Sequence, residues 1–186
     1  MTTIPLRQVR ASFDDDTIVV YQAYSPAIAE PALAAGRFVA PFKIDRMTWI
    51  KPSFLWMMYR CGWATKPDQE RVLAVTITRE GFDWALAHSA LSHHDPAVYP
   101  SQGAWAERKA ASPVRIQWDP ERNLDLAPLP HRSIQVGLGG EAARRYVADW
   151  IVRIDDVTDL AHDRHPLPVE RPYPLPEQLK AIVGAT

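Results

Sequence analysis

The chain has 186 residues, of which 47% are hydrophobic and 23% are charged, and these are ordinary values for a single folded domain. A formal net charge of −1 argues against a surface that is basic throughout but leaves room for a local basic cleft. The single cysteine, Cys61, excludes an intrachain disulfide, and no apolar run reaches membrane-spanning length. Because no signal-peptide pattern opens the chain, we expect a cytoplasmic protein without a membrane partner.

In the first half of the chain, runs of β-branched and aromatic residues alternate with helix-like segments. The helices begin where a Ser precedes a Pro or an apolar run, and they end at a Gly. The second of them is apolar nearly all round, so we expect it to be buried. In chain order we expect a strand over 17–21, a helix over 26–35, a short strand over 38–42, a helix entered at Ser53 and ended by Gly62, a central strand over 72–78 and a helix over 81–91.

The second half of the chain is less regular. Residues 93–112 contain two Pro and no clear periodicity, so we expect a long loop of the kind that often binds ligands. Alternating apolar and polar residues predict two half-buried strands, and 119–122 is expected to be a turn. In chain order we expect strands over 114–118 and 133–138, a helix over 141–149, a last strand over 150–154 and one or two helical turns over 155–161.

This order of elements predicts a single α+β domain over 1–164, with a mixed, mostly antiparallel sheet and short helices. The segment 165–176 has five Pro in twelve residues. We therefore expect 165–176 to be extended and to wrap the surface, as part of a Pro-rich C-terminal tail over 165–186.

No strong catalytic motif is present: there is no Gly-rich phosphate loop, no CxxC pair, no HExxH helix and no nucleophile elbow. His93, His94 and Asp95 offer metal-ligating atoms, but adjacent residues seldom point at one ion, so we expect no metal. Cys61 lies on the core face of a predicted helix, where a buried thiol is inert.

The segment 46–53 is the best candidate for a functional site. An Arg, a Thr, an indole, a Lys and a Ser fall within eight residues at the start of a buried helix, where cations and N–H donors suit a phosphate or pyrophosphate. The alternative is that the Arg pairs with an Asp of 14–16, the Ser only caps the helix and the indole is core. Chargeable side chains beside a buried helix are costly unless something pairs with them, which favours a functional role. The residues are Arg46, Thr48, Trp49, Lys51 and Ser53.

Other polar residues are placed where they could face the same cleft. Gln22 ends a buried strand and either contacts a base or amide edge or is bonded to backbone. Gln135 alternates with apolar neighbours, so it points either into a cleft or into water. Arg7 and Arg10 lie on a short N-terminal arm, where they are either solvated or in contact with a phosphate.

Four segments resemble the hallmark segments of a bacterial and fungal family, the one catalogued as domain of unknown function 4291. They are RQVRASFDDDTIVVYQAY, FKIDRMTWIKPSFLWMMYRCGW, VRIQWDPER and RSIQVGLGGEAARRYVADWIVRIDDVT, and together they span roughly residues 6–160. This resemblance implies a family but no particular activity.

The order of elements is also similar, more distantly, to ADP-ribosyltransferases of the poly-ADP-ribose polymerase and RNA 2′-phosphotransferase type. In that superfamily a first strand ends in a polar residue that contacts NAD, matched here by Tyr21 and Gln22. A later segment with an aromatic residue and a Ser surrounds the nicotinamide ribose, matched here by RMTWIKPSFLWMMY. A third strand holds the ribose 2′-OH, matched here by Gln135, where the transferases often have a Glu. A Gln supplies no negative charge, which departs from that pattern.

The resemblance implies an ADP-ribosyltransferase-like enzyme that binds NAD as a substrate in a basic, aromatic cleft and needs no metal. A nucleotide or nucleic-acid acceptor is expected, since a basic site in a neutral chain suits a phosphate-bearing partner. The alternative is a non-catalytic nucleotide- or RNA-binding module, and a third possibility is a structural protein in which 42–63 is core; the oligomeric state stays open. The implied roles are catalysis for Gln135 and Arg46, cofactor binding for Tyr21, Gln22, Thr48, Trp49, Lys51, Ser53 and Tyr59, and acceptor-phosphate binding for Arg7 and Arg10.

Overall fold

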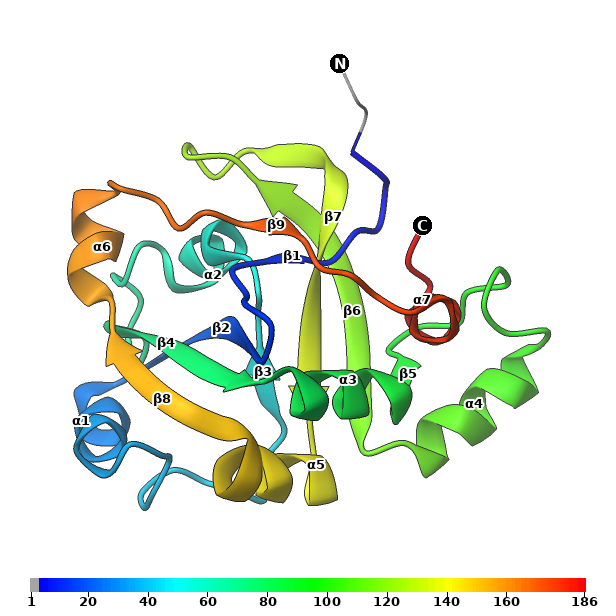
Figure 1. The fold of residues 1–186 in the computed structure, drawn as a ribbon, viewed down its shortest axis with the longest axis horizontal. Coiled ribbons are helices and arrows are strands. Elements are labelled where there is room, and N and C mark those ends of the chain that lie inside the picture. The colour runs from blue at the N-terminus through cyan, green and yellow to red at the C-terminus, as the bar shows by residue number, and fades with distance from the viewer. Residues whose placement is uncertain (1–3) are drawn as a thin grey trace.

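The computed structural model describes residues 4–186 and shows two main sheets, a two-stranded pairing near the chain ends, and helices around them (Figure 1). One sheet has the strand order β2-β4-β8 and is antiparallel throughout, with β2 over Thr17–Tyr24, β4 over Arg71–Thr78 and β8 over Ile151–Asp156. The other has the order β3-β7-β6-β5, with β3 over Thr48–Ile50, β7 over Pro128–Leu138, β6 over Val114–Arg122 and β5 over Ser89–Leu91. The β5–β6 pair is parallel and the others are antiparallel, so the expected α+β class is confirmed.

The strands form where the sequence is β-branched and apolar, and β4 is the clearest case. It lies in the centre of its sheet, and its run from Val72 to Ile77 is buried, as a continuous apolar run predicts. Apolar residues of both sheets, among them Val75 of β4 and Val136 of β7, belong to one buried cluster. The main core therefore contains residues of both sheets.

Two backbone hydrogen bonds join the sheets directly. The Tyr21 amide donates to the Lys51 carbonyl at 2.8 Å, and the Lys51 amide donates to the Tyr21 carbonyl at 3.3 Å. Residue 51 directly follows β3, so the segment 46–53 lies where the two sheets meet.

Helix α2 directly follows this junction and covers a smaller apolar cluster of its own, which contains Met57, Met58 and Cys61. Its burial agrees with its apolar sequence. The helices are α1 over Pro26–Ala35, α2 over Phe54–Cys61, α3 over Arg79–Ala87, α4 over Gln102–Ala111, α5 over Gly140–Arg145, the π-helical turn η1 over Tyr146–Trp150, α6 over Thr158–Asp163 and α7 over Glu177–Val183. None of the helices in residues 4–186 is long and apolar enough to cross a membrane.

The segments near the two ends of the chain pair with each other through backbone hydrogen bonds. Strand β1 over Arg10–Ala11 pairs antiparallel with β9 over Arg171–Pro172, and Figure 1 shows the two running side by side. The Thr186 amide donates to the Arg7 carbonyl at 2.8 Å. We call residues 7–11 together with 169–186 the terminal clasp. Its α7 contributes buried Leu179 and Val183 to the main core, and whether 165–186 is best regarded as a separate tail stays a prediction.

The expected strand over 38–42 was wrong, and the expected helix over 81–91 was wrong in its last part. Residues 38–42 form turns that bring the rings of Phe38 and Phe42 to 4.6 Å, a contact that an extended strand cannot make across four residues. Helix α3 ends at Ala87, and 89–91 instead form β5, which pairs with β6. Tertiary pairing overrides local propensity there.

Three further expectations need correction. The segment 93–112 is not one long loop, because α4 begins after Ser101, whose hydroxyl accepts a hydrogen bond from the Ala104 amide at 3.1 Å. The expected turn at 119–122 belongs to β6, since Asp119 pairs with Ser133 of β7. The expected helix over 141–149 changes to a π-helical turn from Tyr146 onward.

Candidate functional site

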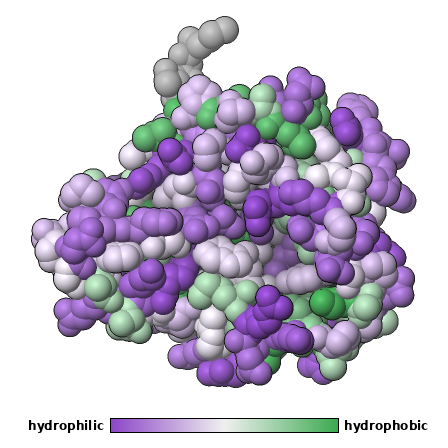
Figure 2. All heavy atoms as spheres, turned by 180° about the vertical axis from the view of Figure 1, so that it is seen from behind, coloured by the Kyte–Doolittle hydropathy of each residue, from purple (hydrophilic) through white to green (hydrophobic). Residues whose placement is uncertain are grey.

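A cavity of about 860 Å³ opens at the junction of the two sheets, between the end of β2, β3, α2 and one face of β6 and β7. The side of the molecule opposite the view of Figure 1 is mostly hydrophilic and is hollowed near its centre (Figure 2). Most of the residues predicted to form the site line this cavity: Gln22, Arg46, Thr48, Trp49, Lys51, Tyr59 and Gln135. The sequence thus identified one wall of a real cavity.

The amide of Gln22 forms part of the cavity wall and is held by other side chains. Its Nε2 donates to Thr48 Oγ1 at 2.6 Å and to Tyr24 Oη at 2.8 Å, and its Oε1 accepts from Tyr146 Oη at 2.6 Å. Burial raises the pKa of Tyr24 to about 12, so this network stays neutral at physiological pH. The partners of Gln22 are mainly side chains, and the network fixes the shape of the wall.

Gln135 faces the cavity and lies beside a carboxylate. Its Nε2 donates to Gln117 Oε1 and to Asp119 Oδ2, both at 2.8 Å. Gln117 pairs with Gln135 in the β6–β7 register, so neighbouring strands place the three side chains on one face. The negative charge that Gln135 itself lacks is therefore present next to it, on Asp119.

Lys51 is the most unusual cation of the cavity. It is only 6% exposed, and its Nζ donates to the Trp49 carbonyl at 3.2 Å. Within the described residues 4–186 no carboxylate lies within 4.0 Å of it. Burial lowers the pKa of Lys51 to about 7, and repulsion from Arg60 adds to the effect, while Asp119 partly opposes it.

The other cations of the cavity also lack ion pairs with the part of the chain that the structure describes. Arg46, Arg60 and Arg122 line the same space, against two carboxylates, Asp68 and Asp119. The expected alternative, a pair between Arg46 and an Asp of 14–16, is not formed within these residues. The cavity thus presents an excess of positive charge.

Aromatic rings form a further wall. The rings of Trp56 and Tyr59 stack at 5.1 Å between centroids, and the Arg122 guanidinium lies 3.7 Å from the centroid of Tyr59. This cation–π contact holds Arg122 flat against the wall. Trp49 lines the cavity from β3.

Two of the predicted cofactor-binding residues lie outside the cavity. Tyr21 belongs to the small apolar cluster under α2, with its ring edge against Phe54 at 5.3 Å. The Ser53 hydroxyl accepts from the Trp56 amide at 3.1 Å and donates to Glu121 Oε1 at 2.9 Å. Ser53 is therefore the N-cap of α2, as the alternative interpretation held, and Tyr21 contributes its backbone to the junction of the sheets.

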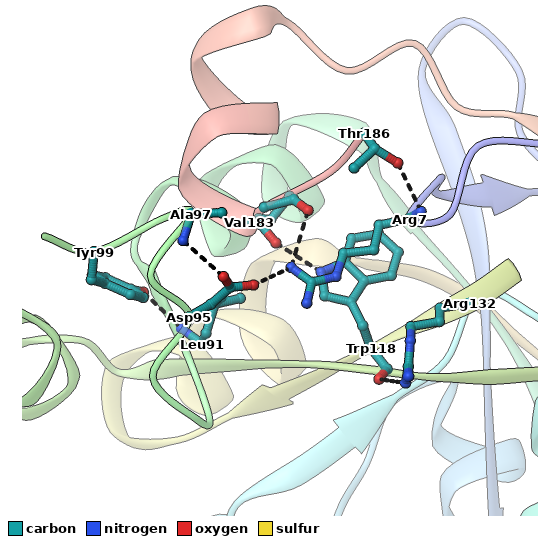
Figure 3. A network of polar contacts seen from close by, with 10 residues as sticks. Arg7, Leu91, Asp95, Ala97, Tyr99, Trp118, Arg132, Val183 and Thr186 are labelled. Atoms are coloured by element: carbon teal, nitrogen blue, oxygen red, sulfur yellow. Dashed lines mark hydrogen bonds and ion pairs between the residues drawn. The ribbon is translucent and has the colours of Figure 1, made fainter. Parts of the chain in front are cut away.

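The two arginines of the N-terminal arm are engaged in the terminal clasp. Arg7 Nη1 donates to Asp95 Oδ2 at 2.6 Å and to the Gly184 carbonyl at 3.4 Å, and Figure 3 shows the guanidinium of Arg7 directed toward Asp95. Arg10 bonds Gln8 Oε1 and the Glu170 carbonyl, at 3.0 and 3.2 Å. Arg7 also lines a second cavity of about 260 Å³, which shares a wall with the first.

That second cavity contains the histidines considered for metal binding. His93, His94 and Asp95 line it together with Arg7, and the shared wall consists of Gln117 and Asp119. Among the described residues no group of three or more His, Cys, Asp or Glu side chains could hold a metal ion.

Sequence reasoning missed several cavity residues. Asp119 and Gln117 continue the alternation of the preceding strand, a signal that the turn-forming Pro120 concealed. Arg60 and Trp56 lie on α2, on the side that the apolar pattern left unassigned, and Arg122 closes β6.

The fold and the cavity together define an α+β protein with a cation-rich, aromatic-walled cavity where two sheets meet. The model of the family described as domain of unknown function (DUF4291) matches residues 8–174, so the chain belongs to that family. A comparison with curated proteins found no match.

Proposed function

We propose that the protein is an ADP-ribosyltransferase-like enzyme of the cytoplasm that binds NAD in the large cavity and transfers ADP-ribose to a nucleotide or nucleic acid. The observation that carries the proposal is the set of three arginines that line the cavity without a carboxylate within 4.0 Å in residues 4–186: Arg46, Arg60 and Arg122.

Arg46 and Arg60 are exposed and Arg122 is half-buried, and none of the three charges is neutralised by a carboxylate of the described residues. Guanidinium groups placed together in this way favour an anionic ligand. The pyrophosphate of NAD is a ligand of this kind. A volume of about 860 Å³ lies within the usual range of ligand cavities, which is roughly 300–1,000 Å³. In this arrangement Arg46 and Arg60 contact the pyrophosphate, and Trp49 or the Trp56–Tyr59 pair stacks on a ring.

The pair of Gln135 and Asp119 suits the reacting ribose. When the bond between ribose C1″ and nicotinamide breaks, the ribose gains positive charge, and a nearby carboxylate stabilises it. Gln135 hydrogen-bonds a ribose hydroxyl, while Asp119, at 2.8 Å from the Gln135 amide, supplies the charge.

The small cavity supports an acceptor that carries phosphate. It shares Gln117 and Asp119 with the large one, so a molecule bound there lies next to the ribose site. The donors of Arg10 are directed to Gln8 and Glu170, so the proposal keeps Arg7 alone as an acceptor contact, and Arg7 has to exchange its bond to Asp95 for one to the acceptor phosphate.

The test is calorimetric titration with NAD at low salt, followed by an assay for released nicotinamide with and without RNA. Arg46→Ala and Arg60→Ala are expected to weaken NAD binding about tenfold each. Arg145→Ala is a matched control, because Arg145 is exposed, pairs with Glu141 and does not line the cavity. Binding with release supports the proposal, and the absence of NAD binding refutes it.

One observation favours the alternative, a non-catalytic nucleotide- or RNA-binding module. Both amide atoms of Gln22 and the Nε2 of Gln135 are already bonded within the protein, so these groups contact a ligand only by giving up a bond. This alternative predicts RNA binding that weakens steeply with salt and no nicotinamide release.

A further inference from the structure

We infer that Lys51 is the proton acceptor of the site, and that its amine takes the proton of the acceptor hydroxyl while that oxygen attacks the ribose. The inference rests on the proposed function and deepens it. It replaces the expected role of Lys51, a fixed cation holding phosphate, by that of a catalytic base.

The position of Lys51 is fixed by the fold. Its backbone forms two hydrogen bonds with Tyr21, at 2.8 and 3.3 Å, so the residue is anchored where the sheets meet. Lys51 is only 6% exposed, yet it lines the large cavity. The amine is thus held in place and directed to the space where a substrate would bind.

The hydrogen bonding around Nζ favours the uncharged amine. An ammonium has three N–H donors, and within the described residues Nζ has one acceptor, the Trp49 carbonyl at 3.2 Å. A charged Lys51 would leave two buried donors without a protein partner. A neutral amine keeps this one bond and has a lone pair available for a proton.

The groups around Lys51 act in both directions, and those that disfavour the ammonium prevail. From α2, the Arg60 guanidinium repels a second positive charge, while the neighbouring Cys61 has its own pKa raised by burial. From β6, Asp119 attracts the ammonium but does not approach within 4.0 Å, and Arg46 and Arg122 line the same cavity. Burial first and Arg60 second bring the pKa of Lys51 to about 7 against the smaller opposing effects of Cys61 and Asp119, and a pKa near 7 is where a general base works best at neutral pH.

The step balances without a further reactant. The acceptor oxygen forms a bond to ribose C1″, the bond from C1″ to the nicotinamide nitrogen breaks, and its electron pair leaves with nicotinamide. The hydroxyl proton passes to Lys51 Nζ and later to water. Asp119 takes no part in this proton transfer and stabilises the ribose, so Lys51 and Asp119 have separate roles.

The first experiment measures the protonation state of Lys51 without reference to activity. The full chain is labelled with a trace of acetic anhydride at pH 5–11, and acetylation of each lysine is followed by mass spectrometry against an added amine standard. We expect Lys51 to reach half of its maximal reactivity near pH 7. Half-maximal reactivity in the ordinary range of a lysine, near pH 10.5, would overturn the inference.

The second experiment separates a base from a phosphate-binding cation. Lys51→Arg keeps a positive charge but cannot accept a proton, so we expect NAD affinity within about threefold of wild type and nicotinamide release to acceptor at least about 100-fold slower. Arg60→Met removes the repulsion and should move the acidic limb of the pH–rate profile to higher pH. Undiminished release by Lys51→Arg, or an unmoved limb, would refute the role of Lys51.

These results are distinguishable from a failure of the proposed function. If wild-type protein does not bind NAD in the calorimeter, the NAD proposal fails whatever the labelling shows. If NAD is bound and turned over but Lys51 labels as an ordinary lysine, the transferase stands and the inference about Lys51 falls.

Discussion

The large cavity and the terminal clasp use the same kinds of residue in opposite ways. In the clasp, Arg7 is paired with Asp95 and with the Gly184 carbonyl, and Arg10 is bonded to Gln8 and Glu170. Around the cavity, the cations have no carboxylate within 4.0 Å in the part of the chain that the structure describes. Arg7 has a counterion within the fold and stabilises structure, whereas the cavity cations have none among the described residues, so their charge is available to a ligand.

The largest expected effect comes from removing α7 from the clasp. Deleting residues 177–186 takes buried Leu179 and Val183 out of the core and breaks the bond from Trp118 Nε1 to the Val183 carbonyl at 2.7 Å. We expect the free energy of unfolding to fall by at least about 4 kcal/mol, measured by urea denaturation. Lys180→Ala is the control, since it removes only a surface pair with Glu177 and should change stability by less than about 0.5 kcal/mol. An unchanged midpoint for the deletion would show that α7 is not part of the folded unit.

A second prediction compares how the free energy of unfolding depends on pH through two buried groups, Glu170 of the clasp and Lys51 of the cavity. Burial raises the pKa of Glu170 from 4.5 to about 8, and nearby Glu121 contributes to the rise. Between these values the folded protein keeps a proton that the unfolded chain has lost. Stability from this group is therefore present below pH 4.5 and is lost as pH rises to about 8.

Lys51 has the opposite sign. Its pKa falls from 10.5 to about 7, so between these values the unfolded chain carries the extra proton and stability rises with pH. Each group contributes a slope of up to about 1.4 kcal/mol per pH unit. Urea unfolding from pH 5 to 10 should show that Glu170→Gln removes the fall and Lys51→Met removes the rise. Parallel curves for wild type and both variants would contradict the burial of the two groups.

A smaller effect is expected from Arg7→Met. This change keeps the apolar stem but leaves the part-buried Asp95 carboxylate without its partner, at 19% side-chain exposure. We expect a loss of about 1–3 kcal/mol in the free energy of unfolding at pH 7, read from urea denaturation. A loss of less than about 0.5 kcal/mol would show that the pair between Arg7 and Asp95 does not stabilise the fold.

The smallest change in stability is expected from Arg46→Met at the cavity. Arg46 is exposed and forms no ion pair with the described residues, so its removal should alter unfolding by less than about 0.5 kcal/mol. NAD affinity, measured by calorimetry in parallel, should fall about tenfold. If the free energy of unfolding falls and the NAD affinity does not, Arg46 stabilises the fold and does not bind the ligand, contrary to the comparison above.

The elements that could be predicted from the sequence are those that are buried and have an apolar sequence. Helix α2 and strands β2 and β4 were predicted because apolar residues run through them without interruption. The end of β6 was missed because Pro120 and its acidic neighbours favour a turn, whereas pairing with β7 keeps them extended. Helix α4 was missed because it has no buried residue, so no periodic apolar face marks it.

For the candidate site, the sequence located one wall and not the other. The segment 46–51 stood out because its cations and donors are adjacent in the chain. Asp119, by contrast, meets Gln135 only through the register of two strands, and no local pattern records that register. Ser53 was assigned to the ligand although its capping of α2 already accounts for it, because a cap and a ligand contact use the same residue types.

The terminal clasp also has a consequence for the order of folding. The bond between Arg10 and Glu170 joins residues 160 positions apart, so closing the clasp orders a loop of nearly the whole chain. The entropy of such closure is largest before the intervening sheets have formed and falls once they have drawn the ends together. The clasp is therefore expected to close after the rate-limiting step. Contacts absent from a transition state slow unfolding without accelerating folding, so the clasp acts on the lifetime of the folded protein.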